Sequence, residues 1–199
     1  MEKSEKTAIT AILAIVAIFC IIVFFKFIGL TGFSNVQVGT VDITIGAMVD
    51  ITLIDANISF GNGTVTQGAP FAIIDSCGGT SINGSWAPVI DYFILENSGS
   101  VYANITISSA NGAGFVGGNP AYQAYYYNYT DNETGSCLVE DKASSTYWNL
   151  TVAGDRTCGK LNFTDETDSI KTCLKLMIPS DAPPALRADQ VTFSATQSE

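Results

Sequence analysis

VYANITIS, residues 101–108, is the stretch of this chain that decides its fold. Every second residue from Val101 to Ile107 is apolar, and polar or aromatic residues stand between them. Side chains of a β-strand point to alternate faces, so this spacing predicts a strand with one face in a core. Asn104, the first residue of an Asn-Ile-Thr triplet, then falls on the opposite, solvent-facing side.

Similar segments recur on both sides of this stretch. The candidates, in chain order, are Val36–Ile45, Ile54–Phe60, Phe71–Asp75, Val89–Glu96, Tyr122–Asn128, Ser145–Val152, Ile170–Pro179 and Gln190–Ala195. In Ile54–Phe60 the even-numbered residues are the apolar ones, so Ile54, Ala56, Ile58 and Phe60 are expected on the core face. Turn-forming residues separate the segments, and we expect no amphipathic helix after Phe33. The pattern predicts an all-β fold, an antiparallel β-sandwich.

Val89–Leu95 differs from the other segments because it is apolar on both faces. We expect it to form a central strand that is covered on both sides. Asp91, the one charged residue in it, is interpreted as structural.

Thr7–Phe25 is the second feature that shapes the interpretation. It has nineteen residues without a charge or a proline, and as a helix it would be about 28 Å long, close to the thickness of the bilayer's hydrocarbon core. Large apolar side chains occur on all sides of such a helix, so it must lie in lipid or in a bundle of copies of itself. We therefore divide the chain into a short charged tail (residues 1–6), the hydrophobic helix with the start of a hinge (7–33) and a β-sandwich (34–199).

The N-terminal segment does not have the features of a cleaved signal. Its apolar run exceeds the 7–15 residues that are typical of a signal peptide, and Phe-Phe-Lys-Phe follows it. A lipoprotein site at Cys20 would need a small residue where Phe19 stands. We expect the short tail inside the cell and the large domain outside.

The charge balance excludes some partners. From Phe27 onward there are 17 acidic and 6 basic residues, and there is no histidine in the chain. A basic groove for nucleic acid is thereby excluded. The commonest general base and the commonest metal ligand are also missing.

Four cysteines, Cys77, Cys137, Cys158 and Cys173, follow the hydrophobic segment. An even set beyond such a segment predicts two disulfides in an oxidising compartment, with three possible pairings. We favour Cys137–Cys158, which closes a loop, together with Cys77–Cys173, which ties distant parts of the chain.

Asparagine gives a second indication of export. Of twelve asparagines, eight begin the triplet Asn-X-Ser/Thr (a sequon): Asn57, Asn62, Asn83, Asn104, Asn128, Asn132, Asn149 and Asn162. Each is a potential acceptor for N-glycosylation on an exported surface. A β-protein rich in Ser, Thr and Asn produces some sequons by chance, which accounts for part of this number.

The N-terminal pattern resembles that of archaeal type IV pilins and archaellins. The resemblance covers about thirty residues: a short charged leader with Lys3-Ser4 before Glu5, then the wholly apolar Thr7–Phe25, then a β-domain. It implies a filament whose core is made of packed helices coated by β-domains. Proteins of this kind usually have a basic residue followed by Gly or Ala at the processing site, so the chain departs from the pattern there.

Two stretches of the domain resemble cell-surface modules. Leu95-Glu96-Asn97-Ser98-Gly99-Ser100-Val101 is similar to the "LxNxGxV" strand–turn–strand of Ig-like modules. Ile178–Pro183 and Val191–Ala195 are similar to the closing strands of archaeal and bacterial cell-surface sandwiches, although Pro184-Ala185-Leu186 stands where those have a glycine. The resemblance implies an Ig-like sandwich and brings no catalytic residue.

Three other patterns could form chemical sites. Gly112–Gly117 matches the dinucleotide pattern GxGxxG, but it lies in an all-β context and is interpreted as a loop. Oxygen ligands that could hold Ca²⁺ gather in two segments, Asn128–Asp141 and Asp165–Asp168. The simpler interpretation is that both segments are solvated loops. A cluster of five tyrosines could serve subunit contacts or carbohydrate stacking: Tyr122, Tyr125, Tyr126, Tyr127 and Tyr129. The simpler interpretation is that they belong to an amphipathic strand beside the core.

The sequence therefore favours a non-enzymatic extracellular structural glycoprotein without a cofactor. The first hypothesis is a pilus-like filament of identical subunits, in which Ala8, Ala11, Ala14 and Ala17, spaced by three, permit close helix packing. The alternative is a surface or adhesion glycoprotein that one membrane helix anchors and that does not polymerise. A surface carbohydrate or a host-cell ligand is a further possible partner.

Overall fold

The computed structural model describes residues 15–18, 43 and 46–199. Residues 15–18 are α-helical and fall inside the helix expected over Thr7–Phe25. The rest of that helix, including Ala8, Ala11 and Ala14, and almost all of Val36–Ile45 lie outside the described residues. Among the residues that are described, no helix is long and apolar enough to cross a membrane. The chain divides into two units, Met1–Thr44 and Ile45–Glu199.

The second unit is built from strands and two short 3-10 helices. Its elements are β1 (Thr52–Asp55), β2 (Phe71–Asp75), β3 (Thr80–Ile82), β4 (Phe93–Glu96), β5 (Ala103–Ser109), η1 (Gly112–Val116), η2 (Pro120–Tyr122), β6 (Ala124–Asp131), β7 (Cys137–Glu140), β8 (Trp148–Asn149), β9 (Asp155–Leu161), β10 (Ser169–Pro179) and β11 (Val191–Gln197). The prediction of an all-β fold is confirmed for this unit.

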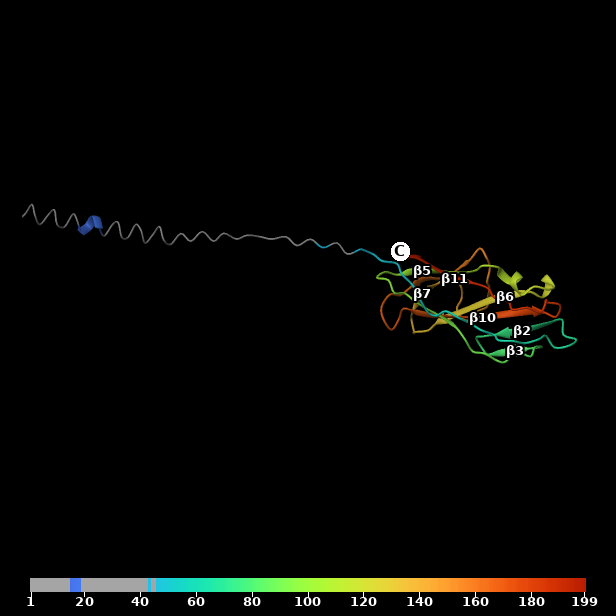
Figure 1. The fold of residues 1–199 in the computed structure, drawn as a ribbon. Helices are drawn as coiled ribbons and strands as arrows, with labels where there is room; N and C mark the ends of the chain where they lie inside the picture. Colours follow the sequence, from blue (N-terminus) through green and yellow to red (C-terminus); the bar gives the residue numbers. More distant parts are fainter. Residues whose placement is uncertain (1–14, 19–42, 44–45) are drawn as a thin grey trace, which may run out of the picture. The chain divides into compact units, whose positions relative to one another are not determined.

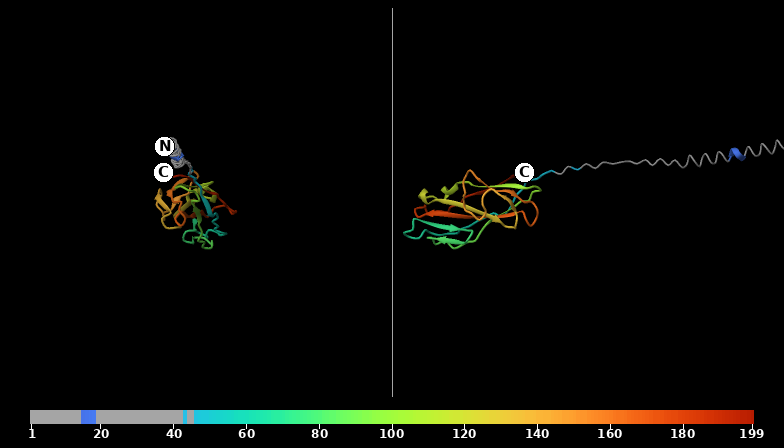
Figure 2. Two further views of the ribbon diagram at one scale, coloured as in Figure 1. Left: turned by 90° about the vertical axis from the view of Figure 1, so that its left-hand side faces the viewer. Right: turned by 180° about the vertical axis from the view of Figure 1, so that it is seen from behind.

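The strands form two antiparallel sheets, which run along the length of the domain (Figures 1 and 2). In the seven-stranded sheet β10 is central: it pairs with β6 on one side and with β4 and β2 on the other. β1, β3 and β8 are added outside β4, β2 and β6 respectively. The second sheet has four strands in the order β11-β5-β9-β7.

β5 has the geometry that its sequence predicts. Ala103, Ile105 and Ile107 are fully buried, whereas Asn104 between them is half-buried. They belong to one hydrophobic core that also contains side chains of β4, β6 and β10 from the other sheet. Burying an Ile side chain contributes roughly 1.5–3 kcal/mol, so the alternating face of β5 is a main source of stability.

The turn between β4 and β5 explains the Asn-Ser-Gly of residues 97–99. The Asn97 side chain is 1% exposed, and its Nδ2 donates to the carbonyl oxygens of Val101 at 3.0 Å and Asn162 at 2.9 Å. Its Oδ1 accepts from the backbone N–H of Gly99. A side chain at Gly99 would collide with the backbone of Met48 and Asp50. This turn therefore requires an asparagine at position 97 and a glycine at position 99.

The expectation for Ile54–Phe60 is correct only in its second half. β1 ends at Asp55, and it is Leu53 that packs against the core, whereas Ile54 is 58% exposed. The pairing with β4 shifts register between Leu53 and Asp55, and such an irregularity reverses which residues face inward. Ile58 and Phe60 do pack against the core, as the alternation predicts.

The central strand predicted from Val89–Leu95 is shorter than expected. β4 starts at Phe93 and is paired on both sides, but Ile90 before it is 67% exposed. Asp91 has a structural role, because its carboxylate accepts from the backbone N–H groups of Ser59 and Tyr92.

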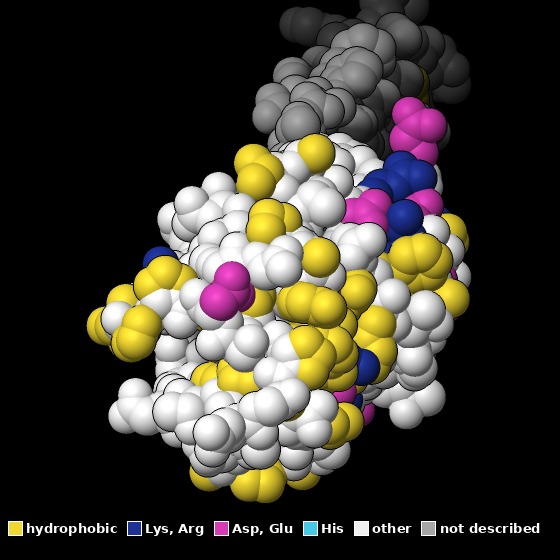
Figure 3. All heavy atoms as spheres, turned by 90° about the vertical axis from the view of Figure 1, so that its right-hand side faces the viewer, with side chains coloured by type: hydrophobic (Ala, Val, Ile, Leu, Met, Phe, Trp, Pro, Cys, Tyr) yellow, Lys and Arg dark blue, Asp and Glu magenta, His cyan; other side chains and the backbone are white. Residues whose placement is uncertain are grey.

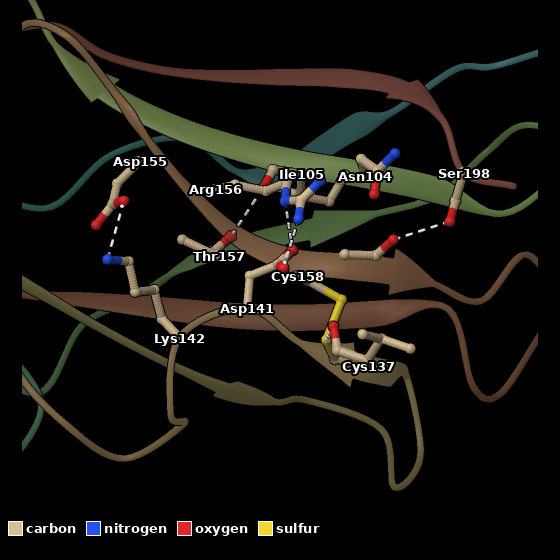
Figure 4. A network of polar contacts seen from close by, with 12 residues as sticks. Asn104, Ile105, Cys137, Asp141, Lys142, Asp155, Arg156, Thr157, Cys158 and Ser198 are labelled. Atoms are coloured by element: carbon tan, nitrogen blue, oxygen red, sulfur yellow. Dashed lines mark hydrogen bonds and ion pairs between the residues drawn. A yellow bond between two sulfur atoms is a disulfide. The ribbon is translucent and has the colours of Figure 1, made fainter.

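The four cysteines beyond residue 46 form two disulfides, Cys77–Cys173 and Cys137–Cys158, the pairing that the sequence favours. The first joins the end of β2 to the middle of β10, 96 residues away, and the second joins β7 to β9. Ion pairs lie beside the second one (Figure 4), with Arg156 Nε 2.6 Å from Asp141 Oδ2 and Lys142 Nζ 3.2 Å from Asp155 Oδ1. Bridges of this kind form in an oxidising compartment.

Candidate glycan-acceptor sites

The eight sequon asparagines differ in how accessible they are. Five are exposed (Asn57, Asn62, Asn83, Asn132 and Asn149), two are half-buried (Asn104 and Asn162), and Asn128 is 9% exposed. A glycan needs its amide nitrogen at the surface, so the eight positions are not equivalent.

Two of the exposed sequons, those of Asn62 and Asn83, meet on one short ribbon through their third residues, Thr64 and Ser85. Val65 and Gly84 form an antiparallel bridge, which places the triplet 62–64 opposite residues 85–87. The hydroxyl oxygens of Thr64 and Ser85 are 3.1 Å apart, and the Thr64 N–H donates to Ser85 Oγ at 2.9 Å. The hydroxyl of each sequon is therefore engaged by the other sequon.

Trp86 covers the opposite face of this ribbon. Its ring lies against the backbone of Gly63 and Gly84, the middle residues of the two sequons, and leaves no space for a Cβ at either position. The repeated Asn-Gly-Ser/Thr triplet is the one sequence signal of this pairing. The contact itself joins residues 21 apart in the sequence, so it does not follow from local alternation.

The two half-buried asparagines are held by the fold. Asn104 Nδ2 donates to the carbonyl oxygen of Gln197 at 3.2 Å. Asn162 Nδ2 donates to Thr167 Oγ1 at 2.8 Å, and its Oδ1 accepts from the backbone N–H of Phe163. An amide carries two N–H groups, so each of these side chains keeps one that is not used in these contacts.

Asn128 is the least accessible of the eight sequon asparagines in the folded domain. It lies in the middle of β6, directly opposite the disulfide-bonded Cys173 of β10. Its Oδ1 is buried and has no hydrogen-bond partner. A sugar attached here would have to replace packed protein atoms.

We therefore expect Asn128 to carry no glycan in protein that has folded with both disulfides. The measurement is peptide mapping by mass spectrometry after enzymatic deglycosylation in ¹⁸O-labelled water, which marks each formerly occupied asparagine. The exposed Asn57 and Asn149 are the internal controls. Substantial labelling of Asn128 in the native fraction would contradict the burial found for this side chain.

The tyrosine cluster belongs mostly to the core. Tyr125, Tyr127 and Tyr129 are at most 4% exposed and point inward from β6, as the simpler interpretation of this stretch expects. Tyr127 Oη donates to Asp155 Oδ2 at 3.1 Å, and Tyr129 Oη to the carbonyl oxygen of Thr157 at 2.8 Å. Burial, reinforced by Asp155, raises the pKa of the Tyr127 hydroxyl above its usual value. Tyr122 and Tyr126 are half-buried.

The GxGxxG stretch forms η1, a 3-10 helix of five residues. A dinucleotide site needs this pattern at the start of a full helix between parallel strands. All strand pairs around η1 are antiparallel, which agrees with the interpretation of a loop.

The two acidic segments considered for Ca²⁺ do come together. Glu133 Oε2 accepts from the backbone N–H of Asp168 at 3.0 Å, and the Asn132 N–H donates to the carbonyl oxygen of Ser169. In the part of the chain that the structure describes, no group of three or more Asp, Glu or Cys side chains is placed to hold a metal ion. Calcium binding stays a prediction from the sequence.

Asp168 makes this region sensitive to pH. Its side chain is 6% exposed, and burial, followed by the charges of Glu96, Glu133 and Asp165, raises its pKa from 3.8 to about 6. A raised pKa in the folded state means that ionisation opposes folding. The stabilisation from protonated Asp168 is thus complete below about pH 4 and is lost as the pH rises through 6.

Asp168→Asn is accordingly expected to stabilise the protein at pH 7.5, by on the order of 1 kcal/mol. The gain should shrink toward zero at pH 4, where Asp168 is uncharged in both states. Urea unfolding of both proteins at several pH values measures this difference, with the exposed Glu199→Gln as the control, because Glu199 is not among the charges that act on Asp168. A gain that does not depend on pH would contradict the assignment.

Comparison with protein-family models, with curated proteins and with solved structures finds no match to this chain.

Proposed function

We propose that this protein is a non-enzymatic, extracellular structural glycoprotein that forms a pilus-like filament. The observation that carries the proposal is the uncharged run Thr7–Phe25, joined by a short segment to one compact domain that begins near residue 46. A helix that is apolar on every side needs an apolar environment throughout its length. Copies of the same helix can supply that environment, with the domains outside.

The chemistry of the domain supports an exported location. It contains two disulfides, and seven of its eight sequon asparagines reach the surface at least in part. Its fold is proposed to be Ig-like, on the two antiparallel sheets and on the resemblance of residues 95–101 to such modules.

The charge distribution supports a domain that stays solvated beside many copies of itself. Residues 46–199 carry 16 acidic and 6 basic side chains. Four lysines lie over aromatic rings, at 4.4–5.3 Å from the ring centroid: Lys142 over Trp148, Lys160 over Tyr102, Lys171 over Tyr92 and Lys175 over Tyr147. On the face in Figure 3 uncharged side chains predominate, and most charged ones gather at one side. The net negative charge keeps the domain solvated and leaves the contacts between copies to the N-terminal segment.

A single-pass anchored surface or adhesion protein is the second candidate. The length of Thr7–Phe25, which matches one crossing of a bilayer, favours it. The two candidates agree on the location of the domain and differ in what surrounds the N-terminal segment.

Fractionation of producing cells separates these candidates. Mechanical shearing without detergent should release a filament, which then sediments at high speed. An anchored protein would stay with the membranes until detergent dissolves them. Release by detergent alone would count against the filament.

A further inference from the structure

Asn149 occupies a position that the other sequons lack. It lies in β8, whose two residues pair with β6 so that Asn149 is directly opposite Tyr126. Side chains opposite each other in antiparallel strands point to the same face, with Cβ atoms about 4.5–5.5 Å apart. The exposed Asn149 therefore stands beside the half-buried Tyr126.

A crevice of about 330 Å³ opens at the same place. Gly112, Ala113 and Val152 give it an apolar side, while Gln123, Asn149 and Thr151 contribute polar groups. Gln123 Nε2 donates to the carbonyl oxygen of Gly118 at 2.9 Å, which fixes this amide at the crevice. The volume is at the lower end of the range for ligand pockets, about 300–1,000 Å³.

Its lining suits a sugar. A pyranose ring has an apolar face of C–H groups that stacks on an aromatic ring, and it has hydroxyl groups at its rim that need polar partners. Among the described residues, the Asn149 amide and the Thr151 hydroxyl make no hydrogen bond with another side chain, in contrast to Thr64 and Ser85 of the paired sequons. The Asn149 sequon is thus both reachable and next to a surface that a sugar can cover.

We propose that this crevice holds the first sugar residue of a glycan carried by Asn149, with the apolar face of the sugar on Tyr126. The inference rests on the proposed function, because it requires that the domain is exported and glycosylated. Attachment replaces one amide hydrogen: a bond forms between Nδ2 and the anomeric carbon of a lipid-phosphate-linked glycan. The bond from that carbon to the phosphate oxygen breaks, and the proton leaves with the phosphate. The attached sugar then stabilises the β6–β8 edge.

The test is a cycle of variants of the full chain made in a eukaryotic secretion host that adds N-acetylglucosamine-based glycans. Asn149→Gln removes the glycan in question, and Asn57→Gln removes one from the irregular segment after β1. Each of the two asparagine variants is made once with the native Tyr126 and once together with Tyr126→Leu. Mass spectrometry of glycopeptides gives the occupancy, and thermal unfolding gives the midpoint.

Asn149→Gln is expected to lower the unfolding midpoint by about 2–4 °C with Tyr126 present and by much less with Tyr126→Leu. Asn57→Gln should change little in either background, and neither change should matter in protein made without glycosylation. Equal losses in both backgrounds, or an empty Asn149 beside an occupied Asn57, would overturn the proposal.

A second measurement avoids the Tyr126 variant in case it does not fold. The wild-type glycan is trimmed to one N-acetylglucosamine, and the NMR signals of the sugar protons at Asn149 are recorded. The ring current of Tyr126 should shift them upfield relative to those at Asn57, and identical shifts would overturn the proposal. The filament is tested separately by cell fractionation, so glycosylated protein that does not assemble would refute the proposed function and leave this inference standing.

Discussion

Full-length protein with Ala14→Trp is expected to be exported and folded but to form no filament. Ala8, Ala11, Ala14 and Ala17 follow one another at intervals of three, so consecutive members are neighbours on the helix surface. Small side chains at a helix surface allow helices to approach closely. A Trp at Ala14 would hold neighbouring copies apart along the segment that joins them. We expect the sedimentable, detergent-free fraction to fall at least about 10-fold, and a 10-fold change in an association constant corresponds to about 1.4 kcal/mol.

Val16→Trp is the matched control, because residue 16 lies about 200° from residue 14 around an ideal helix. Secretion, both disulfides and the unfolding midpoint should be the same in the two variants. An anchored monomer would tolerate both substitutions. Normal filaments from Ala14→Trp would therefore contradict the hypothesis that helices pack closely at these alanine positions.

Removal of the Cys77–Cys173 disulfide is expected to be the most destabilising change within the domain. The bond closes a segment with a sequence separation of 96, and it holds β2 against the central strand β10. Constraining the unfolded chain over this length contributes about 4–5 kcal/mol. A protein with a total stability of about 5–15 kcal/mol would lose a large part of it in Cys77→Ser/Cys173→Ser.

Cys137→Ser/Cys158→Ser provides the comparison, because that bond has a sequence separation of only 21. The same relation gives about 3 kcal/mol for it. Equilibrium unfolding in urea of the wild type and the two double variants measures both decreases in stability. A smaller decrease for the Cys77–Cys173 pair than for the Cys137–Cys158 pair would contradict the entropic account.

Local alternation was sufficient to predict several of the strands that carry the core. Phe71–Asp75 and β2 have identical bounds, and β5, β10 and β11 differ from their predicted segments by two residues or fewer at either end. In β2 and β5 the period of two is regular, and one face is buried along its whole length. Burial and sequence pattern then give the same answer.

The missed strands lack that regularity. In β9 three consecutive residues, Thr157, Cys158 and Gly159, are all buried, and the pairing with β5 shifts register twice. In β7 the apolar residues Leu138 and Val139 are exposed. β3 has only three residues, too few for an alternation of polar and apolar residues to be recognised. The positions of these strands are set by long-range pairing and by the Cys137–Cys158 bond, which a local pattern cannot reveal.

The acceptor sites show the same division. Alternation along β5 correctly predicted that Asn104 points away from the core. It could not predict that Asn128, which alternation along β6 also points outward, is covered. The segment that follows β7 passes near this part of β6, with the Ser145 N–H donating to the carbonyl oxygen of Tyr129. Only the tertiary structure distinguishes an outward-pointing side chain from an accessible one.

The most direct test of the proposed assembly is cryo-electron microscopy of the native surface fraction, sheared from cells without detergent. The proposed function predicts helical filaments with a core of closely packed helices, formed by Thr7–Phe25, and β-domains on the outside. N-terminal sequencing of the same sample defines where the mature chain begins. A fraction without filaments, in which the intact protein is recovered as single copies from the membrane, would contradict the central claim.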